Sequence, residues 1–219
     1  MKLKEFELWA FKQELAECRK FTLFSRSVYA HYERYFCQIE TNGIYRVIIK
    51  LSESDKRNGT TELSSSVLKF YQAFDFIEFN RLGENEKKLC LLDTLQQALV
   101  KLTVMYEWPI EPFNQAYAAV LRDSFVNHYT FRKKHNRNRK LIAELECHHE
   151  STSFDCFVKI KNKIGEVLFS KRLFSAEPDE FLFNGLLGDI RWIDNETLAV
   201  LNKDKSESER IRVSDIINQ

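Results

Sequence analysis

Residues 83–126 read GENEKKLCLLDTLQQALVKLTVMYEWPIEPFNQAYAAVLRDSFV, and they decide the fold class of this 219-residue chain. Apolar residues recur at intervals of three and four, which places them on one face of an α-helix. They are Leu91, Leu95, Ala98, Leu102 and Met105, then Phe113, Ala116, Tyr117, Val120, Leu121 and Phe125. Asn85 is the expected N-cap, with Glu86 in the first turn; Pro109 ends the first helix and the second begins near Pro112. Two amphipathic helices with a short connection pack as a hairpin, so we expect them to cover one face of a sheet.

The sequence after this pair alternates between apolar and polar residues, which is the pattern of β-strands. Residues 141–147 and 154–160 both alternate, and a loop at 150–153 places Cys147 opposite Cys156 and Glu144 opposite Lys159. Further strands are expected at 167–174, 190–193, 197–202 and 210–213, with a turn at 194–196 and a short helical turn within 178–187. The C-terminal part is therefore predicted to be a β-meander.

The sequence before the helix pair is expected to be mostly β as well. Residues 3–18 are interpreted as an opening helix, and strands are predicted at 21–24, 29–40 and 44–51. The turn Thr41-Asn42-Gly43 predicts a hairpin between the last two strands, because Asn and Gly accept the positive φ angles of tight turns. Residues 52–66 are polar and predict a mobile loop, whereas 67–79 fit a strand or a helix, with a strand favoured.

Together these segments predict the α+β class, with antiparallel β-meanders flanking a central two-helix hairpin. A single domain spanning residues 1–219 is expected, and a subdivision into 1–127 and 128–219 is the alternative. A chain of this length buries an adequate core without disulfides or a structural metal.

Charge and cysteine content indicate a cytoplasmic protein without a membrane partner. The 33 basic and 32 acidic residues nearly cancel, so no global field attracts nucleic acid or an anionic membrane. No apolar stretch approaches the roughly 20 residues that span a bilayer, and residues 1–6 lack the apolar core of a signal peptide. The five cysteines form no Cys-x-x-Cys pair, so reduced thiols in the core are expected.

The sequence contains no recognised catalytic or cofactor motif. Gly-x-Ser-x-Gly, Gly-x-Gly-x-x-Gly and Gly-Lys-Ser/Thr are all missing, and Pro178-Asp179 lacks the downstream Asp/Glu-x-Lys of a metal-dependent nuclease. Alternation puts Cys147, His149 and Cys156 on one strand face, but a fourth zinc ligand is not evident. Glu144 and Glu146 share a face and fit a paired acid and base, although alternating glutamates also occur on ordinary solvent faces. No catalytic residue, metal or cofactor is expected, and an unrecognised enzyme is the third alternative.

Residues 132–140 carry six basic side chains and no acidic one. They are Arg132, Lys133, Lys134, Arg137, Arg139 and Lys140. A solvated loop that links helix to sheet is one interpretation of this segment. The others are a contact with an acidic protein surface and the binding of RNA or DNA phosphates through counterion release.

A family resemblance rests on three short segments. They are Phe74-Asp75-Phe76-Ile77-Glu78-Phe79, Glu86-Lys87-Lys88 and Leu92-Asp93-Thr94-Leu95-Gln96-Gln97-Ala98-Leu99. These resemble segments of small bacterial cytoplasmic proteins, some of which look like immunity proteins of polymorphic or contact-dependent toxin systems. The resemblance implies a protein that binds a cognate toxin and occludes its active site or substrate surface. It assigns no residue roles.

Two functional hypotheses follow from the sequence. The first is a stoichiometric inhibitor that binds one cognate protein, with Glu144, Glu146, Asp194 and Glu196 facing a basic cleft of that partner. The second is a nucleic-acid-associated protein that binds through the basic segment 132–140.

Overall fold

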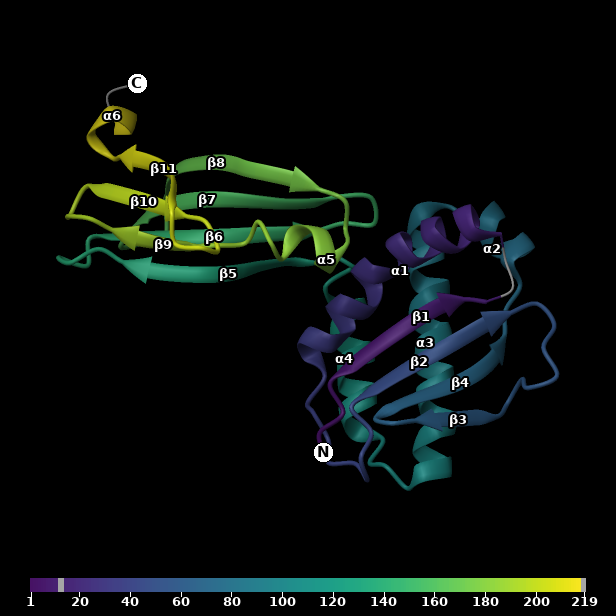
Figure 1. Ribbon diagram of the computed structural model, residues 1–219. Coiled ribbons are helices and arrows are strands. Elements are labelled where there is room, and N and C mark those ends of the chain that lie inside the picture. The colour runs from purple at the N-terminus through teal and green to yellow at the C-terminus, as the bar shows by residue number, and fades with distance from the viewer. Residues whose placement is uncertain (12–13, 218–219) are drawn as a thin grey trace. The chain divides into compact units, whose positions relative to one another are not determined.

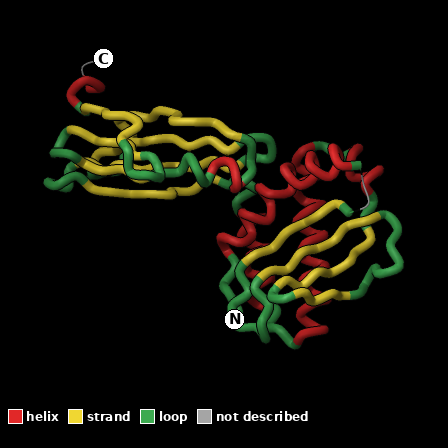
Figure 2. Tube along the Cα trace, in the orientation of Figure 1, coloured by secondary structure: helices red, strands yellow, loops and turns green. Residues whose placement is uncertain are grey.

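The computed structural model describes residues 1–11 and 14–217, and the chain divides into two compact units, Met1–Asn127 and His128–Gln219. The first unit combines a sheet with a helical layer, and the second consists mainly of strands (Figures 1 and 2). The predicted α+β class is confirmed, although the sheets are antiparallel only in part.

The N-terminal unit is built on a four-stranded sheet whose order is β1-β2-β4-β3. Its strands are β1 (Glu5–Ala10), β2 (Arg46–Ser52), β3 (Thr61–Ser64) and β4 (Val67–Ala73). β1 pairs with β2 and β2 with β4 in parallel, and only the edge strand β3 is antiparallel. The prediction of an antiparallel meander is therefore wrong for this unit. Adjacent parallel strands require a crossover connection, and α1 (Leu15–Tyr35) supplies it between β1 and β2.

The helix α1 occupies the segment in which strands were predicted at 21–24 and 29–40. Its buried side chains include Phe21, Val28 and Tyr32, which follow the helical period and not alternation. Aromatic and β-branched residues favoured a strand locally, but burial of this stripe against the sheet outweighs that preference. The opening helix predicted at 3–18 is also wrong, because residues 5–10 form β1 with Phe6 and Leu8 buried on one face.

The turn at Asn42-Gly43 was recognised correctly but assigned to the wrong connection. Gly43 has φ +87°, as the sequence predicted, yet the turn follows α1 and leads into β2. No hairpin forms at this point. The turn residues specify a local backbone shape, and they do not specify which elements the turn joins.

The two central helices are confirmed as α3 (Glu84–Tyr106) and α4 (Glu111–Arg122). Gly83, and not Asn85, is the N-cap of α3, and its N–H donates to Glu86 Oε2 at 2.8 Å. Met105 is exposed, so it does not belong to the buried face of α3. Figure 1 shows α1, α3 and α4 on the same side of the sheet. The core of this unit forms between these helices and that side of the strands.

Two further segments, 67–79 and 52–66, differ in part from their predicted structure. Residues 67–73 form β4 as favoured, but residues 76–79 belong to a short helix, α2 (Phe76–Arg81). Asp75 caps this helix by accepting the N–H of Glu78 at 2.8 Å. The expected loop at 52–66 contains the edge strand β3, whose side chains are mostly exposed. An edge strand with little covered surface has no apolar alternation to reveal it.

The carboxyl group of Glu33 binds to the outer edge of β1. The N–H of Phe6 donates to Glu33 Oε1 of α1 at 2.6 Å, so the edge strand is tied to the crossover helix. Burial raises the pKa of Glu33 to about 8. Tyr32, the residue before Glu33, lies on the inner face and donates its hydroxyl to the carbonyl of Phe113 at 3.0 Å. These two bonds fix α1 between the sheet and α4.

The C-terminal unit contains two antiparallel sheets, with orders β5-β6-β7-β8 and β11-β10-β9. The strands of the first are β5 (His128–His135), β6 (Leu141–His149), β7 (Phe154–Asn162) and β8 (Val167–Ala176). Those of the second are β9 (Asp189–Trp192), β10 (Thr197–Leu201) and β11 (Glu207–Arg212), and two short helices are α5 (Glu180–Phe183) and α6 (Ser214–Ile217).

The predicted strand register in this unit is confirmed. Cys147 pairs with Cys156, and Glu144 pairs with Lys159 across β6 and β7. Both cysteines are buried in a core that contains residues of both sheets, whereas Cys37 of the other unit is exposed and not a core residue. The opposite face of the four-stranded sheet carries charged side chains. The two sheets therefore form a sandwich with one charged outer face.

At Gly188, the backbone before β9 lies too close to β10 to leave room for a side chain. A Cβ atom on Gly188 would lie 1.7 Å from the carbonyl oxygen of Leu201, whereas a Cβ on Gly185 would make an ordinary contact of 3.7 Å with Leu182 O. We expect Gly188→Ala to reduce the free energy of unfolding by about 1–3 kcal/mol or more, because the backbone must move apart. Gly185→Ala is the matched control, and its effect should stay within about 0.5 kcal/mol. Urea unfolding followed by circular dichroism measures both, and equal losses would contradict the packing described here.

Candidate functional site

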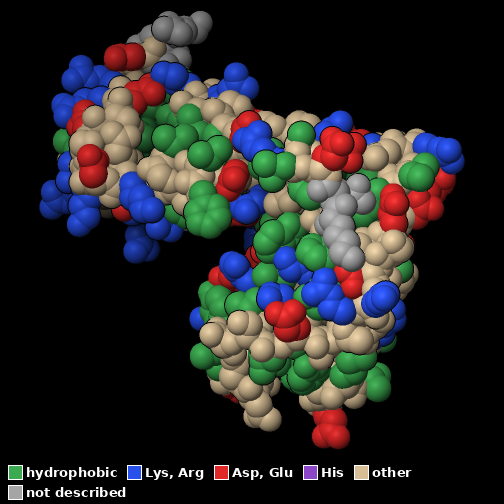
Figure 3. Space-filling view, turned by 45° about the vertical axis from the view of Figure 1, so that its right-hand side comes forward, with side chains coloured by type: hydrophobic (Ala, Val, Ile, Leu, Met, Phe, Trp, Pro, Cys, Tyr) green, Lys and Arg blue, Asp and Glu red, His purple; other side chains and the backbone are tan. Residues whose placement is uncertain are grey.

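The N-terminal sheet has one face that none of the described helices covers, and we call it the open face. Alternation along β1, β2 and β4 directs one set of side chains to this side, opposite the core. The set consists of Glu5, Glu7, Trp9, Arg46, Ile48, Lys50, Val67, Lys69 and Tyr71, with Phe11 just after β1. It combines aromatic rings with charges of both signs. In Figure 3, basic and apolar side chains are interspersed on this unit.

Trp9 and Lys50 form the centre of the open face. Lys50 Nζ lies 3.0 Å from the centroid of the Trp9 ring, a cation–π contact between neighbouring strands. Lys50 is only 7% exposed, whereas Trp9 is 41% exposed. Burial, with a smaller contribution from the nearby positive charge of Lys69, lowers the pKa of Lys50 to about 8. A charged amine is thus held at low exposure beside an indole that solvent reaches.

Arg57 and Lys69 are each bound to a carboxylate. The guanidinium of Arg57 lies 4.0 Å from the centroid of the Tyr71 ring and donates to Asp55 through Nε and Nη2, both at 3.1 Å. Lys69 donates to Glu62 Oε1 at 2.6 Å, and the Tyr71 hydroxyl donates to Glu62 Oε2 at 2.7 Å. These bonds hold the cations and the ring in fixed positions.

Arg46, the remaining cation of the open face, is also paired. Its Nε donates to Glu5 Oε2 at 2.7 Å, and its Nη1 lies 3.9 Å from Glu7 Oε2. Lys50 differs from the other three cations, since within residues 1–11 and 14–217 its side chain makes neither an ion pair nor a hydrogen bond. An almost buried ammonium without such a partner is costly to keep, which makes it a candidate functional group.

No local pattern singles out Trp9, Lys50 and Tyr71. Sequence analysis predicts Trp9 on an opening helix, and Lys50 is one lysine in a predicted strand. They meet because β1, β2 and β4 are parallel neighbours in which Trp9 pairs with Lys50 and Lys50 with Tyr71. A correct strand order would have been needed to find the site.

The charged face of the C-terminal sheet contains two of the acidic residues expected to bind a partner. Glu144 is 3% exposed, and its two oxygens contact Lys133 Nζ at 3.0 Å and Lys161 Nζ at 2.5 Å. Burial alone would raise the pKa of Glu144, but the hydrogen bonds from Lys161 and Lys133 outweigh it and hold the pKa below its usual value. Glu146 accepts from Lys159 at 2.5 Å. Both carboxylates are therefore neutralised inside the unit.

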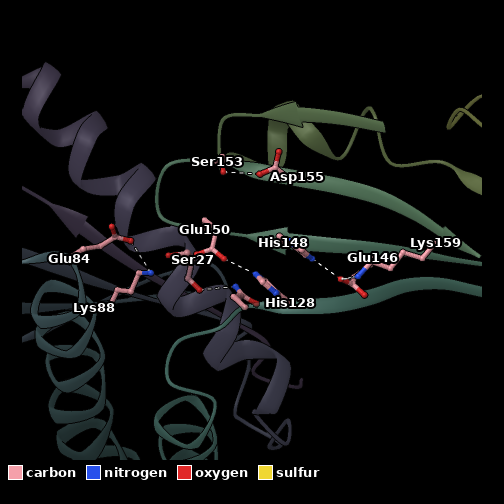
Figure 4. Close-up of polar contacts among 11 residues, drawn as sticks. Ser27, Glu84, Lys88, His128, Glu146, His148, Glu150, Ser153, Asp155 and Lys159 are labelled. Atoms are coloured by element: carbon pink, nitrogen blue, oxygen red, sulfur yellow. Dashed lines mark hydrogen bonds and ion pairs between the residues drawn. The ribbon is translucent and has the colours of Figure 1, made fainter. Parts of the chain in front are cut away.

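A stacked histidine pair, which the sequence analysis missed, lies next to Glu146 (Figure 4). The rings of His128 and His148 lie face to face, with centroids 3.6 Å apart. His148 Nε2 lies 2.7 Å from Glu146 Oε1, and His128 Nε2 lies 2.8 Å from Glu150 Oε1. Each imidazole is thus bound to a carboxylate, and the cluster links β5 to β6. The antiparallel pairing of His128 with His148 is the signal that would have found it.

Metal binding was considered for Cys147, His149 and Cys156. Cys147 and Cys156 lie opposite each other in the core, as alternation predicted. His149 is also buried, and its ring packs against Phe154 and Phe183 at centroid distances of 5.5 and 5.4 Å. Within the described part of the chain, no group of three or more His, Cys, Asp or Glu side chains is arranged to hold a metal ion.

The other predicted acidic residues, Asp194 and Glu196, lie on the turn between β9 and β10. Asp194 Oδ1 accepts the N–H groups of Glu196 and Thr197, both at 2.7 Å, so its carboxylate stabilises the turn. The side chain of Glu196 is exposed. The structure brings Glu144 and Glu146 together on one sheet face and places this second pair on a turn.

The basic segment is a strand end followed by a hairpin turn, and the prediction of a loop linking helix to sheet is wrong for Arg132 to His135. Lys133 binds Glu144, and Lys134 binds Asp189 at 2.7 Å, with Arg132 3.9 Å from the same aspartate. The turn residues are exposed and have no ion pair within the described residues; they are Arg137, Arg139 and Lys140. Figure 3 shows Lys and Arg side chains gathered at the end of the C-terminal unit where this turn lies.

No family model, curated protein or solved structure matches this chain. Among the described residues, no helix is both long enough and apolar enough to cross a membrane.

Glu144 provides a test of the charged face. We expect Glu144→Gln to lower the free energy of unfolding by about 1–3 kcal/mol at neutral pH, because Lys133 and Lys161 lose their counter-charge. A carboxyl whose pKa is lowered by folding stabilises the fold above its unfolded pKa, and this contribution is lost as the pH falls. The difference between the wild type and the variant should therefore shrink below about pH 4.

Urea unfolding at neutral and acidic pH measures this difference. Glu196→Gln is the matched control, because Glu196 is exposed and the turn is held by Asp194; its effect should stay within about 0.5 kcal/mol at either pH. A loss at Glu144 that does not change with pH would show that the ion pairs are not its cause.

Proposed function

We propose that this protein is a non-catalytic inhibitor that binds one cognate protein through its open face, as an immunity protein neutralises a bacterial toxin in the cytoplasm. One observation carries the proposal. An exposed tryptophan, Trp9, lies against the unpaired ammonium of Lys50 on a sheet face that no described helix covers. An arrangement that is costly in the free protein is expected where a partner completes it.

The chemistry of the open face supports a protein contact. Trp, Tyr and Arg are the residues that most often dominate binding energy at protein interfaces. Here Trp9, which is 41% exposed, is held by Lys50, and Arg57 is held by Asp55 and by the ring of Tyr71, which is itself only 4% exposed. Side chains that are already fixed lose little conformational entropy on binding, so their contacts contribute more of their energy to affinity.

The groups best suited to acid–base chemistry support a non-catalytic role. Glu144 and Glu146 are bound to lysines of the same sheet. A general base must reach a substrate proton, and these two carboxylates are already neutralised by the lysines. The free thiols of Cys147 and Cys156, opposite each other in one core, fit the reducing cytoplasm that we propose.

Capture from cells of the native host tests this function. The purified protein, immobilised through its C-terminus, should retain one protein partner, and that partner should lose its activity when mixed with an equimolar amount. Trp9→Ala should weaken binding by about 30-fold or more in calorimetry, the cost typical of a central interface tryptophan. Val104→Ser is the matched control, because Val104 is an exposed apolar residue on α3 in the helical layer.

Three results would contradict the proposal. They are the absence of any partner, a partner that stays fully active in the complex, and equal affinities for the wild type and Trp9→Ala.

The nucleic-acid alternative rests on the exposed and unpaired Arg137, Arg139 and Lys140. We expect any such binding to weaken steeply between about 50 and 200 mM salt, with a slope that falls by about 2 when all three are changed to Gln. Fluorescence anisotropy with a labelled single-stranded RNA and a duplex DNA measures both effects. Lys87→Gln/Lys101→Gln, which removes charge from α3, is the control. Absence of binding to both probes at the lower salt concentration would exclude this alternative.

A further inference from the structure

We infer that Lys50 receives a carboxylate from the partner, an Asp or Glu side chain flanked by apolar residues that pack on Trp9. This inference rests on the proposed function and adds the chemistry of the group that binds at the centre of the open face. It follows from the charges of that face, from the ring surfaces that remain free, and from the cost of burying Lys50.

The other cations of the open face are already paired, so the ammonium of Lys50 is the one that can donate hydrogen bonds to a partner. Arg46, Arg57 and Lys69 are each within 3.1 Å of a carboxylate oxygen. Glu7 lies 3.9 Å from Arg46 and makes no ion pair with Lys50. The Lys50 ammonium therefore contacts the Trp9 ring, while its N–H groups have no oxygen acceptor among the described residues. An incoming carboxylate would supply that acceptor.

A single carboxylate fits this face better than a nucleic-acid backbone does. The face carries as many acids as bases, since Glu5, Glu7, Glu62 and Asp55 accompany its four cations. A polyphosphate chain would bring several negative charges next to these acids, and no excess of cations would offset them. The Tyr71 ring is already covered by Arg57, so it offers no free surface for base stacking on that side. One negative group beside apolar contacts satisfies Lys50 and Trp9 together.

The burial of the Lys50 ammonium lowers the free energy of unfolding of the free protein. Its pKa is lowered to about 8, chiefly by burial, so folding disfavours the charged form. The resulting loss of stability is complete below about pH 8 and disappears as the pH rises toward the ordinary lysine value. Ile48, two residues earlier on the same strand face, is apolar and buried. An apolar residue is therefore compatible with this side of β2, and the charge of Lys50 is not required by the fold.

The test is Lys50→Met, which keeps the unbranched stem and removes the charge. We expect its melting temperature at neutral pH to equal or exceed that of the wild type by a few degrees. The gain should diminish as the pH rises above about 8, where the wild-type amine begins to lose its proton, and should be gone near the ordinary lysine pKa of about 10. Its affinity for the captured partner should fall by about 30-fold or more, as for a buried interfacial charge pair. Lys50→Glu should bind more weakly still, and reversing one partner acid to Lys should restore its binding.

Lys69→Met is the matched control, because Lys69 lies on the same face and is already neutralised by Glu62. Its affinity should stay within about 3-fold of the wild type, as expected for an exposed pair. If the partner is captured and inhibited but Lys50→Met binds as tightly as the wild type, this inference is wrong and the proposed function stands. If no partner is captured, the proposed function fails first.

A second measurement needs no partner. The indole N–H resonance of Trp9 in the full chain is followed by NMR while the acetylated and amidated tripeptide Leu-Glu-Leu is added. We expect a saturable shift that is lost in Lys50→Met and is at least about 10-fold weaker with Leu-Gln-Leu. Equal shifts with both peptides, no shift with either, or a larger response to oligouridine would overturn the inference.

Discussion

Parallel pairing of β1 with β2 and of β2 with β4 is the constraint on which the N-terminal unit depends. Parallel neighbours cannot be joined by a tight turn, so the chain must cross over, and α1 makes that crossing between the first two strands. The helices that follow β4 pack on the same side as α1. One face of the sheet is thereby filled with apolar side chains, and the other is left without a helical cover. The location of the candidate site follows from this one-sided packing.

The two units differ in how the charged side chains on the uncovered face of a sheet are paired. On the charged face of the C-terminal sheet, Glu144 and Glu146 are bound by three lysines and His148, so the negative charges are compensated within the strands. On the open face the same pairing operates at every cation except Lys50. The contrast supports a functional role for Lys50, because the chain pairs its charges elsewhere on both faces.

The parts of the fold that were predicted correctly depend on short-range pattern. The α3–α4 pair followed from apolar spacing and two prolines, and the pairing of Cys147 with Cys156 followed from alternation and one loop length. The stretch 21–35 was misread because its aromatic and β-branched residues favour strands locally, although Phe21 and Tyr32 keep the helical period. The turn at Gly43 was recognised by its chemistry, but a turn does not record whether a helix or a strand precedes it.

By itself, the sequence determined the α+β class, the helical pair, and the strand register and buried cysteine pair of the C-terminal sheet. These properties arise from residues that are close in the chain, where side-chain period and turn geometry leave few choices. Only the tertiary structure decided the parallel order of the first sheet, the burial of Glu144 and the meeting of Trp9 with Lys50. Trp9 and Lys50 are 41 positions apart, and the two lysines that contact Glu144 lie on different strands. The energy of such contacts depends on which elements pack together, which no local pattern encodes.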